Sequence, residues 1–340
     1  MAITRVWQTG AETGLKTEFP AWVGGAYAVV STPNKTGTYV YRCYFNGNYA
    51  QYAFADTLQC RIGFYINTVD LVSVGTSNRI VTLLTSGDTE LISIRVKGTS
   101  VNFPMDLYVA SSQEDTEDYL HSSNAWVHVG LDVKIDSSVG WATVYINGIE
   151  KLSFSGDTGT GTIGIVRIGC SGGAGEPVFY DDLYIDDTTG EASSATVPML
   201  NFQWIYPNET GNYDQWIGSD ADNTNNYLLV DERPPSTADY VEEDTVDQFD
   251  SYAMTTYALG AGETINAVIP IVYAQRYGAA EELALGTRYS GTNTIGSNQD
   301  PGVGDWTFSW ERQTTKPGDG AWDQAALDGV EVVIYSTGTF

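Results

Sequence analysis

The sequence predicts an all-β protein made of two antiparallel β-sandwich domains, and three observations support this. Between Ala125 and Gly148, apolar and polar residues alternate at every second position on both sides of a turn, which is typical of strands with one buried face. The 36 Gly residues and the frequent Thr, Ser, Asn and Asp suit many strands joined by tight turns. Helical spacing is confined to 279–285 and 321–327, each about two turns long at most.

The first domain reads as a series of strands separated by Gly, Asn, Asp or Ser. Their spacing of roughly 10 to 15 residues is typical of a two-sheet sandwich. The expected strands are 26–31, 38–45, 59–67, 79–85, 90–97, 103–110, 125–135, 141–146, 162–170 and 177–185. The small, polar residues of 193–198 end in a proline, so we expect a linker there between one domain at 1–192, which includes an N-terminal arm, and another at 199–340.

The second domain has fewer clear strands and a long acidic loop at 231–250. In 264–274 both alternating sets of residues are apolar, which predicts a strand covered on both faces. Pro270 lacks an N–H donor, which favours a bulge or an edge position. The apolar segments that we expect to build this domain are 200–207, 251–259, 264–277, 307–313 and 330–340.

The chain is strongly acidic, with 16 basic and 43 acidic residues and a formal net charge of −27. Such a field repels phosphate backbones and anionic membrane surfaces, so we expect neither a nucleic-acid nor a membrane partner. Residues 1–200 carry 11 basic and 21 acidic residues, and residues 201–340 carry 5 and 22. This asymmetry agrees with two separate units.

The cysteines and the N-terminus bear on the cellular compartment. Cys43, Cys60 and Cys170 are odd in number and widely spaced, which favours reduced, buried side chains over a disulfide framework. The first residues contain no apolar run of signal-peptide length, and no stretch reaches the roughly 20 apolar residues of a membrane span. We therefore expect synthesis in the cytoplasm without export by a signal peptide.

Several motifs of the first domain form a recognisable pattern: Trp126 at the start of a long strand, the Asn147-Gly148 hairpin, Gly156-Asp157-Thr158, and Asp181-Asp182 followed by Asp186-Asp187. In this pattern the domain resembles, over about residues 20–190, the concanavalin-A-like (laminin-G/glucanase-type) jelly-roll domains of bacteriophage virion proteins. In the second domain, YLLVDERPPSTADYVE (227–242), DPGVGDWTFSW (300–310) and the closing GVEVVIYS (329–336) resemble a module of tailed-phage structural proteins.

Acidic residues are the first candidates for chemistry, because a glycan-cleaving enzyme needs two carboxylates that flank a sugar. Asp181, Asp182, Asp186 and Asp187 lie in or beside one strand. Strict alternation would place Phe179, Leu183 and Ile185 with Asp181, and Tyr180 and Tyr184 with Asp182 and Asp186. We interpret these acids as the solvated face of a structural strand; a calcium site and a catalytic pair are the alternatives. The segment 112–121 supplies Glu114, Asp115, Glu117 and Asp118, and it reads as a loop.

The remaining candidates have ordinary explanations. His121 and His128 do not form a zinc pattern, and we expect His128 to be a surface or cross-strand residue. The glycine clusters at 159–164 and 169–175 lack the ending of a phosphate loop, so we expect turns. Aromatic rings can stack on sugars or serve as core and subunit contacts, and we favour the latter. The tryptophans of the second domain to which this applies are Trp204, Trp216, Trp306, Trp310 and Trp322.

The resemblance implies a virion structural protein, either a tail fibre or appendage or a capsid decoration protein, and the ordinary explanations of the candidate residues favour a non-enzymatic one. The resemblance implies location in the virion and partners that are other virion proteins and copies of the same chain in a homo-oligomer. Adhesion to host surface polysaccharide is a further expectation. The alternatives are a carbohydrate-binding lectin module and, less favoured, a glycan-cleaving enzyme. No catalytic, cofactor-binding or metal-binding residue is assigned, and no cofactor is expected.

Overall fold

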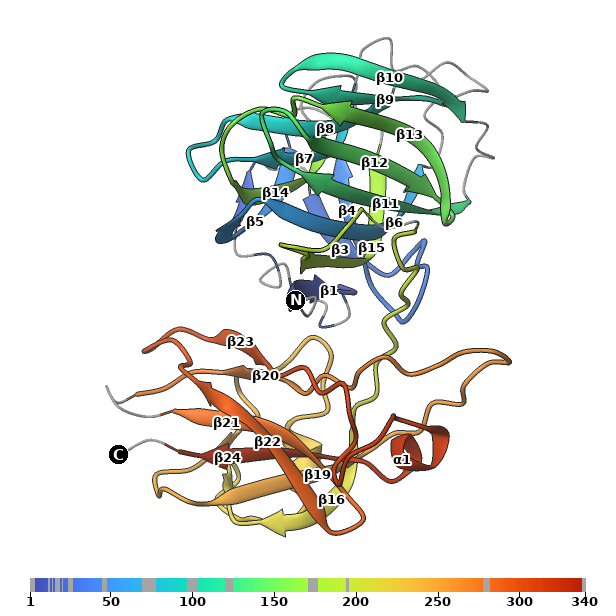
Figure 1. Ribbon diagram of the computed structural model, residues 1–340. Helices are drawn as coiled ribbons and strands as arrows, with labels where there is room; N and C mark the ends of the chain where they lie inside the picture. Colours follow the sequence, from blue (N-terminus) through green and yellow to red (C-terminus); the bar gives the residue numbers. More distant parts are fainter. Residues whose placement is uncertain are drawn as a thin grey trace. The chain divides into compact units, whose positions relative to one another are not determined.

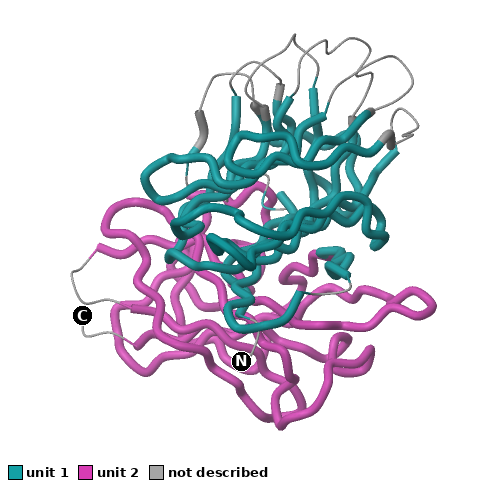
Figure 2. The backbone as a smooth tube through the Cα atoms, turned by 45° about the horizontal axis from the view of Figure 1, so that its top comes forward, with its two compact units in different colours: residues 1–202 teal, residues 203–340 magenta. Residues whose placement is uncertain are grey.

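The computed structural model describes residues 4–11, 13, 15, 19, 21–23, 27–44, 48–68, 78–96, 103–119, 125–170, 177–193, 196–277 and 282–337. The chain forms two compact units, Met1–Phe202 and Gln203–Phe340, which Figure 2 shows in different colours. The described elements are antiparallel strands with one short α-helix and one 3-10 turn, which confirms the all-β prediction. Neither of these two helical elements has the length and hydropathy of a membrane-spanning helix.

The first unit contains two large antiparallel sheets (Figure 1). In the first sheet the strand order is β13-β12-β11-β6-β15-β4-β3, and β1 pairs with β15. Its strands are β1 (Thr4–Thr9), β3 (Tyr27–Val30), β4 (Val40–Tyr44), β6 (Gln59–Thr68), β11 (Trp126–Lys134), β12 (Gly140–Ile146), β13 (Ile149–Gly156) and β15 (Pro177–Asp187).

The second sheet of this unit has the order β10-β9-β8-β7-β14-β5-β2. Its strands are β2 (Ala21–Val23), β5 (Asn48–Thr57), β7 (Asn78–Leu84), β8 (Glu90–Val96), β9 (Phe103–Val109), β10 (Ser112–Tyr119) and β14 (Ile163–Cys170). One apolar cluster fills the space between the sheets, with Phe64 and Leu131 from the first and Leu83 and Ile94 from the second fully buried. This arrangement is the sandwich that the alternating pattern predicts.

All ten strands predicted for this unit are present, and five further strands were not anticipated: β1, β2, β5, β10 and β13. Two of these show why. β10 has the sequence SQEDTEDY, whose acids carry no apolar alternation. In β13 only Leu152 is buried. Edge strands of this kind are held by backbone pairing, which leaves little signal in the hydrophobic pattern.

A β-bulge in β15 changes which side chains face the core. The pairing with β6 shifts between Asp181 and Tyr184, and Asp182 has a positive φ of 49°. After the bulge, Leu183 and Ile185 lie in the core, on the face of Tyr180. The prediction from strict alternation was therefore wrong, because one extra residue in a strand reverses the two faces beyond it.

The residues that follow β15 pack against the outer face of the first sheet. We call residues 188–193 and 196–202 the strap. Its backbone carbonyls at Glu191 and Ala192 accept hydrogen bonds from Gln59 (3.0 Å) and Arg61 (3.1 Å). Val197 is 1% exposed and packs directly on Gly130. A Cβ atom added at Gly130 would lie only 2.6 Å from the Cβ atom of Val197. The segment expected to be a linker thus packs on the sheet in its described residues.

The second unit is built on a sheet of order β16-β19-β24-β21-β22. One face of this sheet packs on two two-stranded ribbons, β17-β18 and β20-β23, around Tyr252, Leu285 and Ile334. Its elements are β16 (Pro207–Asp214), β17 (Ile217–Gly218), η2 (Asn226–Leu229), β18 (Val241–Glu242), β19 (Phe249–Met254), β20 (Ile271–Ala274), β21 (Leu283–Tyr289), β22 (Thr292–Gln299), β23 (Thr307–Trp310), α1 (Gln324–Asp328) and β24 (Glu331–Ser336).

Two expectations for this unit need correction. The segment 279–285 is not helical where it is described, because Leu283–Leu285 belong to β21; the short helix predicted at 321–327 is present as α1. Within 264–277 only Ile271–Ala274 form a strand, all four residues are half-buried, and so the predicted cover on both faces is wrong. The ladder begins after Pro270, as its missing donor predicts.

Candidate functional site

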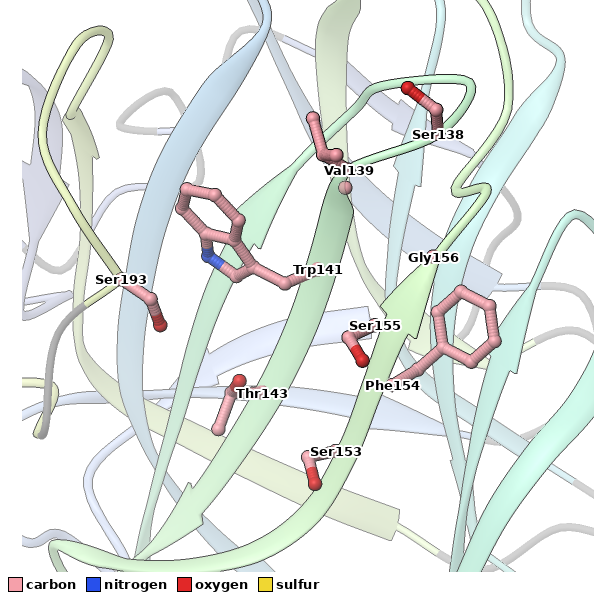
Figure 3. Close-up of a pocket in the computed structure, with 10 residues that line it drawn as sticks. Ser138, Val139, Trp141, Thr143, Ser153, Phe154, Ser155, Gly156 and Ser193 are labelled. Atoms are coloured by element: carbon pink, nitrogen blue, oxygen red, sulfur yellow. The ribbon is translucent and has the colours of Figure 1, made fainter.

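A shallow hollow of about 680 Å³ lies on the outer face of the β12–β13 hairpin (Figure 3). In this hairpin Trp141 pairs with Ser155, and Thr143 pairs with Ser153. Ala142, which lies between Trp141 and Thr143 in β12, faces the core. The side chains of Trp141, Thr143, Ser153 and Ser155 therefore all point outward. The described residues that line the hollow are Ser138, Val139, Gly140, Trp141, Thr143, Ser153, Phe154, Ser155, Gly156 and Ser193.

The walls of the hollow are held by neighbouring segments. Asp136 accepts hydrogen bonds from the backbone N–H groups of Ser138 (2.9 Å) and Val139 (3.0 Å), which order the turn at one end. These donors lower the pKa of Asp136 to about 2. On the other side Ser193 of the strap faces the hollow, and its hydroxyl donates to Asp132 at 3.4 Å.

Trp141 presents an aromatic ring and an unused donor. Its side chain is half-buried, and within the described residues its buried Nε1–H has no hydrogen-bond acceptor. The Lys134 ammonium lies 5.3 Å from the ring centroid. Among the described residues, the side-chain hydroxyls of Thr143, Ser153 and Ser155 likewise form no hydrogen bond. The hollow therefore combines one apolar platform with several free hydrogen-bonding groups.

This lining has the features that bind a polyol. A polyol needs an apolar surface for its C–H groups and several hydrogen-bonding groups for its hydroxyls, and both are present. The described lining residues supply several side-chain hydroxyls and no carboxylate, imidazole or thiol.

Trp141 was not among the residues predicted from the sequence, which were the tryptophans of the second domain. The signal was present: with Ala142, Val144 and Ile146 assigned to the core face, Trp141 and Thr143 must point outward. A tryptophan on the polar face of a strand needs an explanation in a way that a core tryptophan does not.

The five tryptophans singled out in the second domain divide into two groups. Trp216 and Trp322 are 9% and 5% exposed and belong to hydrophobic clusters, which confirms a core role for both. Trp204, Trp306 and Trp310 are half-buried. Trp306 stacks on Tyr273 with ring centroids 5.4 Å apart, so part of its surface is already in contact.

Asp181 and Asp182 are fully buried, so the expected solvated acidic face was wrong. Asp181 accepts from the backbone N–H groups of Lys35 (3.0 Å) and Thr36 (3.3 Å). Asp182 accepts from the Thr36 hydroxyl (2.8 Å) and the Phe202 N–H (3.0 Å), so the pair fastens a loop and the strap to the sheet. Burial raises the pKa of both carboxyls, and the charge of Asp182 raises that of Asp181 further.

The next two acids of β15 are also engaged in structure. Asp186 is 6% exposed and forms an ion pair with Arg5 of β1. Asp187 accepts hydrogen bonds from the Thr57 hydroxyl (3.0 Å) and from the Thr189 N–H (2.8 Å). Each carboxylate thus has a partner that belongs to the fold.

The acids of 112–121 lie in a strand, β10, and the expected loop was wrong. Asp115 accepts a hydrogen bond from the Ser153 N–H (2.9 Å), and Glu117 pairs with Lys151 (3.2 Å). These contacts join the edges of the two sheets, because Ser153 and Lys151 belong to β13. Glu114 is exposed, whereas the side chain of Asp118 and all of His121 lie outside the described residues.

His128 was expected to be a surface or cross-strand residue. It is fully buried, so the surface alternative was wrong and the cross-strand alternative is confirmed. It lies opposite Tyr65 in the sheet, with ring centroids 5.1 Å apart. Burial lowers its pKa to about 4, so the ring is neutral at neutral pH. Cys43 and Cys60 are buried free thiols, as predicted, and the side chain of Cys170 lies outside the described residues.

The described residues contain no group of three or more His, Cys, Asp or Glu side chains placed to hold a metal ion. The described glycines of 159–164 lie in a turn and at the start of β14, and Gly159 has a φ of 101°. Residues 171–176 of the other cluster lie outside the description.

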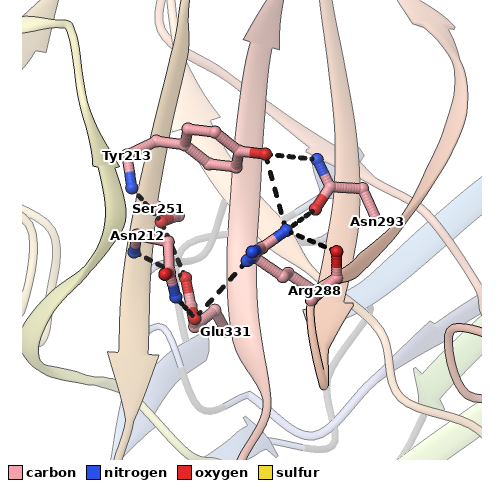
Figure 4. Close-up of polar contacts among 7 residues, drawn as sticks. Asn212, Tyr213, Ser251, Arg288, Asn293 and Glu331 are labelled. Atoms are coloured by element: carbon pink, nitrogen blue, oxygen red, sulfur yellow. Dashed lines mark hydrogen bonds and ion pairs between the residues drawn. The ribbon is translucent and has the colours of Figure 1, made fainter.

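The outer face of the second unit's sheet carries a polar network, shown in Figure 4. Glu331 accepts from the Asn212 N–H (2.8 Å) and the Ser251 hydroxyl (2.9 Å), and it lies 3.8 Å from Arg288. Arg288 in turn donates to Asn293 at 2.8 Å. The network joins β16, β19, β24, β21 and β22, which assigns it a role in holding the sheet together.

No protein-family model matches the chain, and no curated protein is similar to it in sequence. Among solved structures, the cellulose-induced protein Cip1 is 12% identical with a TM-score of 0.41, over 55% of this chain and 98% of its own. Domain 4 of the extracellular arabinanase AbnA from Geobacillus stearothermophilus, in complex with arabinotriose, is 14% identical with a TM-score of 0.39, over 55% and 94%.

A third structure, the binding domain of Paraclostridial Mosquitocidal Protein 1, is 12% identical with a TM-score of 0.38, over 86% of this chain and 75% of its own. With TM-scores below 0.5, these likenesses assign neither a family nor an activity to the chain.

Proposed function

We propose that this chain is a non-enzymatic glycan-binding protein whose first unit holds a saccharide in the Trp141 hollow. The observation that carries the proposal is the exposed part of the Trp141 ring, with its unpartnered indole N–H and the free hydroxyls of Thr143, Ser153 and Ser155 around it. A pyranose would lay its apolar face on the indole, and its hydroxyls would exchange hydrogen bonds with the rim.

The test is a glycan array with the full chain, followed by isothermal titration of the glycans that bind. Trp141→Ala is expected to weaken binding at least about tenfold, since central aromatic anchors dominate binding energies. Trp141→Phe should keep part of the affinity. The matched control is Trp204→Ala, because Trp204 is also half-buried but belongs to the second unit.

Two results would count against the proposal. Unchanged glycan binding by Trp141→Ala would show that the Trp141 hollow is not the saccharide site. Release of new reducing ends from a bound glycan, lost when a carboxylate is neutralised, would favour the glycan-cleaving alternative.

We further propose that the chain acts on a virion, as a tail fibre, tail appendage or capsid decoration protein in contact with copies of itself and with other virion proteins. The resemblance over about residues 20–190 supports this proposal. The test is mass spectrometry of purified particles together with sedimentation of the free chain. Absence of the chain from washed particles would contradict a virion role, and a monomer at high concentration would contradict self-association.

A further inference from the structure

We propose that the loop between Gly218 and Asn226 in the second unit binds a calcium ion. The loop joins β17 to the 3-10 turn η2, with the sequence SDADNTNN after the glycine. Every side chain from Ser219 to Asn226 except that of Ala221 carries an oxygen atom. Calcium prefers oxygen ligands, which include carboxylates, amide carbonyls and water.

Asn226 supplies the observation that points to a ligand. Its side chain is 1% exposed, and its Nδ2 donates to the Trp216 carbonyl and to Asp250, each at 2.9 Å. These two acceptors fix the orientation of the amide, so the opposite atom must be the oxygen. That oxygen, Oδ1, is buried and has no hydrogen-bond partner in the described structure. Buried amide oxygens are otherwise almost always satisfied.

The unpartnered oxygen and a carboxylate oxygen both lie beside Gly218. The position that a Cβ would take at Gly218 is 3.2 Å from Asn226 Oδ1 and 2.5 Å from Asp220 Oδ1, so the two oxygens share the space beside this glycine. Leu229 closes the apolar side, 2.5 Å from the same position. Asp220 Oδ1 accepts only a long hydrogen bond of 3.4 Å, from the Asp222 N–H. A cation between the two oxygens would satisfy both.

The rest of the loop is ordered without using these two oxygens. The Gly218 N–H donates to the Asp222 carbonyl (2.6 Å), and the Thr224 N–H donates to the Asp222 carboxylate (2.7 Å). Behind Asn226, the Oδ1 atom of Asp250 is also buried without a partner. A nearby positive charge would stabilise that carboxylate as well.

The donors favour calcium over other metals. Only oxygen atoms converge, which disfavours zinc, and calcium tolerates irregular sites completed by water better than magnesium does. With one carboxylate directly at the site, we expect a weak site with a Kd of about 10⁻⁴–10⁻³ M. The second unit carries 22 acidic and 5 basic residues between 201 and 340, which raises the local concentration of cations.

The test is calorimetric titration of the metal-stripped full chain with calcium chloride, alongside Asp220→Asn and the control Asp319→Asn. Both substitutions remove one exposed carboxylate from a turn of the second unit. We expect one site per chain, at least about tenfold weaker in Asp220→Asn, unchanged in the control, and weaker for magnesium. Near saturation, calcium should raise Tm by a few degrees in the wild type and the control only.

Hydrogen exchange locates the segment that calcium stabilises, and the Tm without calcium tests whether the variant folds normally. Calcium should increase protection of the peptide over 217–230, and Asp220→Asn without calcium should keep the wild-type Tm. Absence of saturable binding at about 10 mM calcium would overturn the proposal, since this is well above the expected Kd. Binding that persists undiminished in Asp220→Asn would overturn it equally.

Discussion

The first unit is expected to lose stability as the pH rises from about 6.5 to about 8.5, and Asp182→Asn is expected to reduce this loss by removing the repulsion between the two acids while burial continues to raise the pKa of Asp181. Burial, with the added repulsion between two adjacent acids, raises the pKa of Asp181 and Asp182 in the folded chain. The folded chain therefore keeps a proton that the unfolded chain releases above an ordinary carboxyl pKa of about 4. Stability is then lost with rising pH, by up to about 1.4 kcal/mol per pH unit for one retained proton.

His128 determines where the measurement should start. Burial lowers its pKa to about 4, so its contribution to stability is present above about 6.5 and is lost as the pH falls below that value. Above about pH 6.5 the carboxyl pair acts without this opposing effect. Asp182→Asn keeps an oxygen for the Thr36 and Phe202 donors and places an amide where Asp182 Oδ2 has no partner.

The measurement is hydrogen exchange in β6 and β15 as a function of pH, corrected for intrinsic exchange rates, because it reports opening of this unit within the full chain. Glu114→Gln is the matched control, since it removes one exposed charge from the same unit. Parallel pH profiles for the wild type and Asp182→Asn would show that the pair is not the source of the dependence.

Replacing Arg61 with methionine is expected to destabilise the first unit by about 3–5 kcal/mol. Arg61 lies 3.3 Å from Asp132 in an ion pair whose side chains are 9% and 0% exposed. Without the guanidinium, the buried Asp132 carboxylate would lose the countercharge that Arg61 supplies. The strap would also lose the hydrogen bond from Arg61 to the Ala192 carbonyl.

Local opening energies from hydrogen exchange of β6 and β11 test this prediction. The double variant Arg61→Met/Asp132→Asn should recover much of the loss, because it also removes the buried carboxylate that loses its Arg61 countercharge. Arg79→Met should cost about 1 kcal/mol or less, since Arg79 is 30% exposed in its pair with Glu90. A double variant no more stable than Arg61→Met would show that the cost arises from lost packing and not from the buried charge.

The sandwich of the first unit could be predicted because long strands with one buried face leave a period of two in the sequence. That signal fails where backbone geometry decides. The positive φ at Asp182 reverses the faces of β15, and nothing in the alternation marks the bulge. β10 carries acids on an edge and so lacks an apolar pattern.

The candidate site was half visible in the sequence. The outward direction of Trp141 follows from the alternation of β12, whereas the contribution of Ser193 depends on the strap folding back over the sheet. That return could not be predicted from a short, polar, proline-terminated segment, which is equally typical of a linker. The approach of Asn226 Oδ1 and Asp220 Oδ1 to the same glycine, Gly218, likewise depends on the three-dimensional course of a loop.

The indole N–H of Trp141 lies at the proposed saccharide site, so its resonance should respond when a glycan binds. A nitrogen–proton correlation spectrum of the labelled full chain, with this resonance assigned from its absence in Trp141→Phe, should be recorded while an array-selected oligosaccharide is added. We predict that the Trp141 resonance shifts progressively and saturates with the Kd from calorimetry, while the resonances of the buried Trp216 and Trp322 stay in place. A glycan that binds without moving the Trp141 resonance would contradict the account.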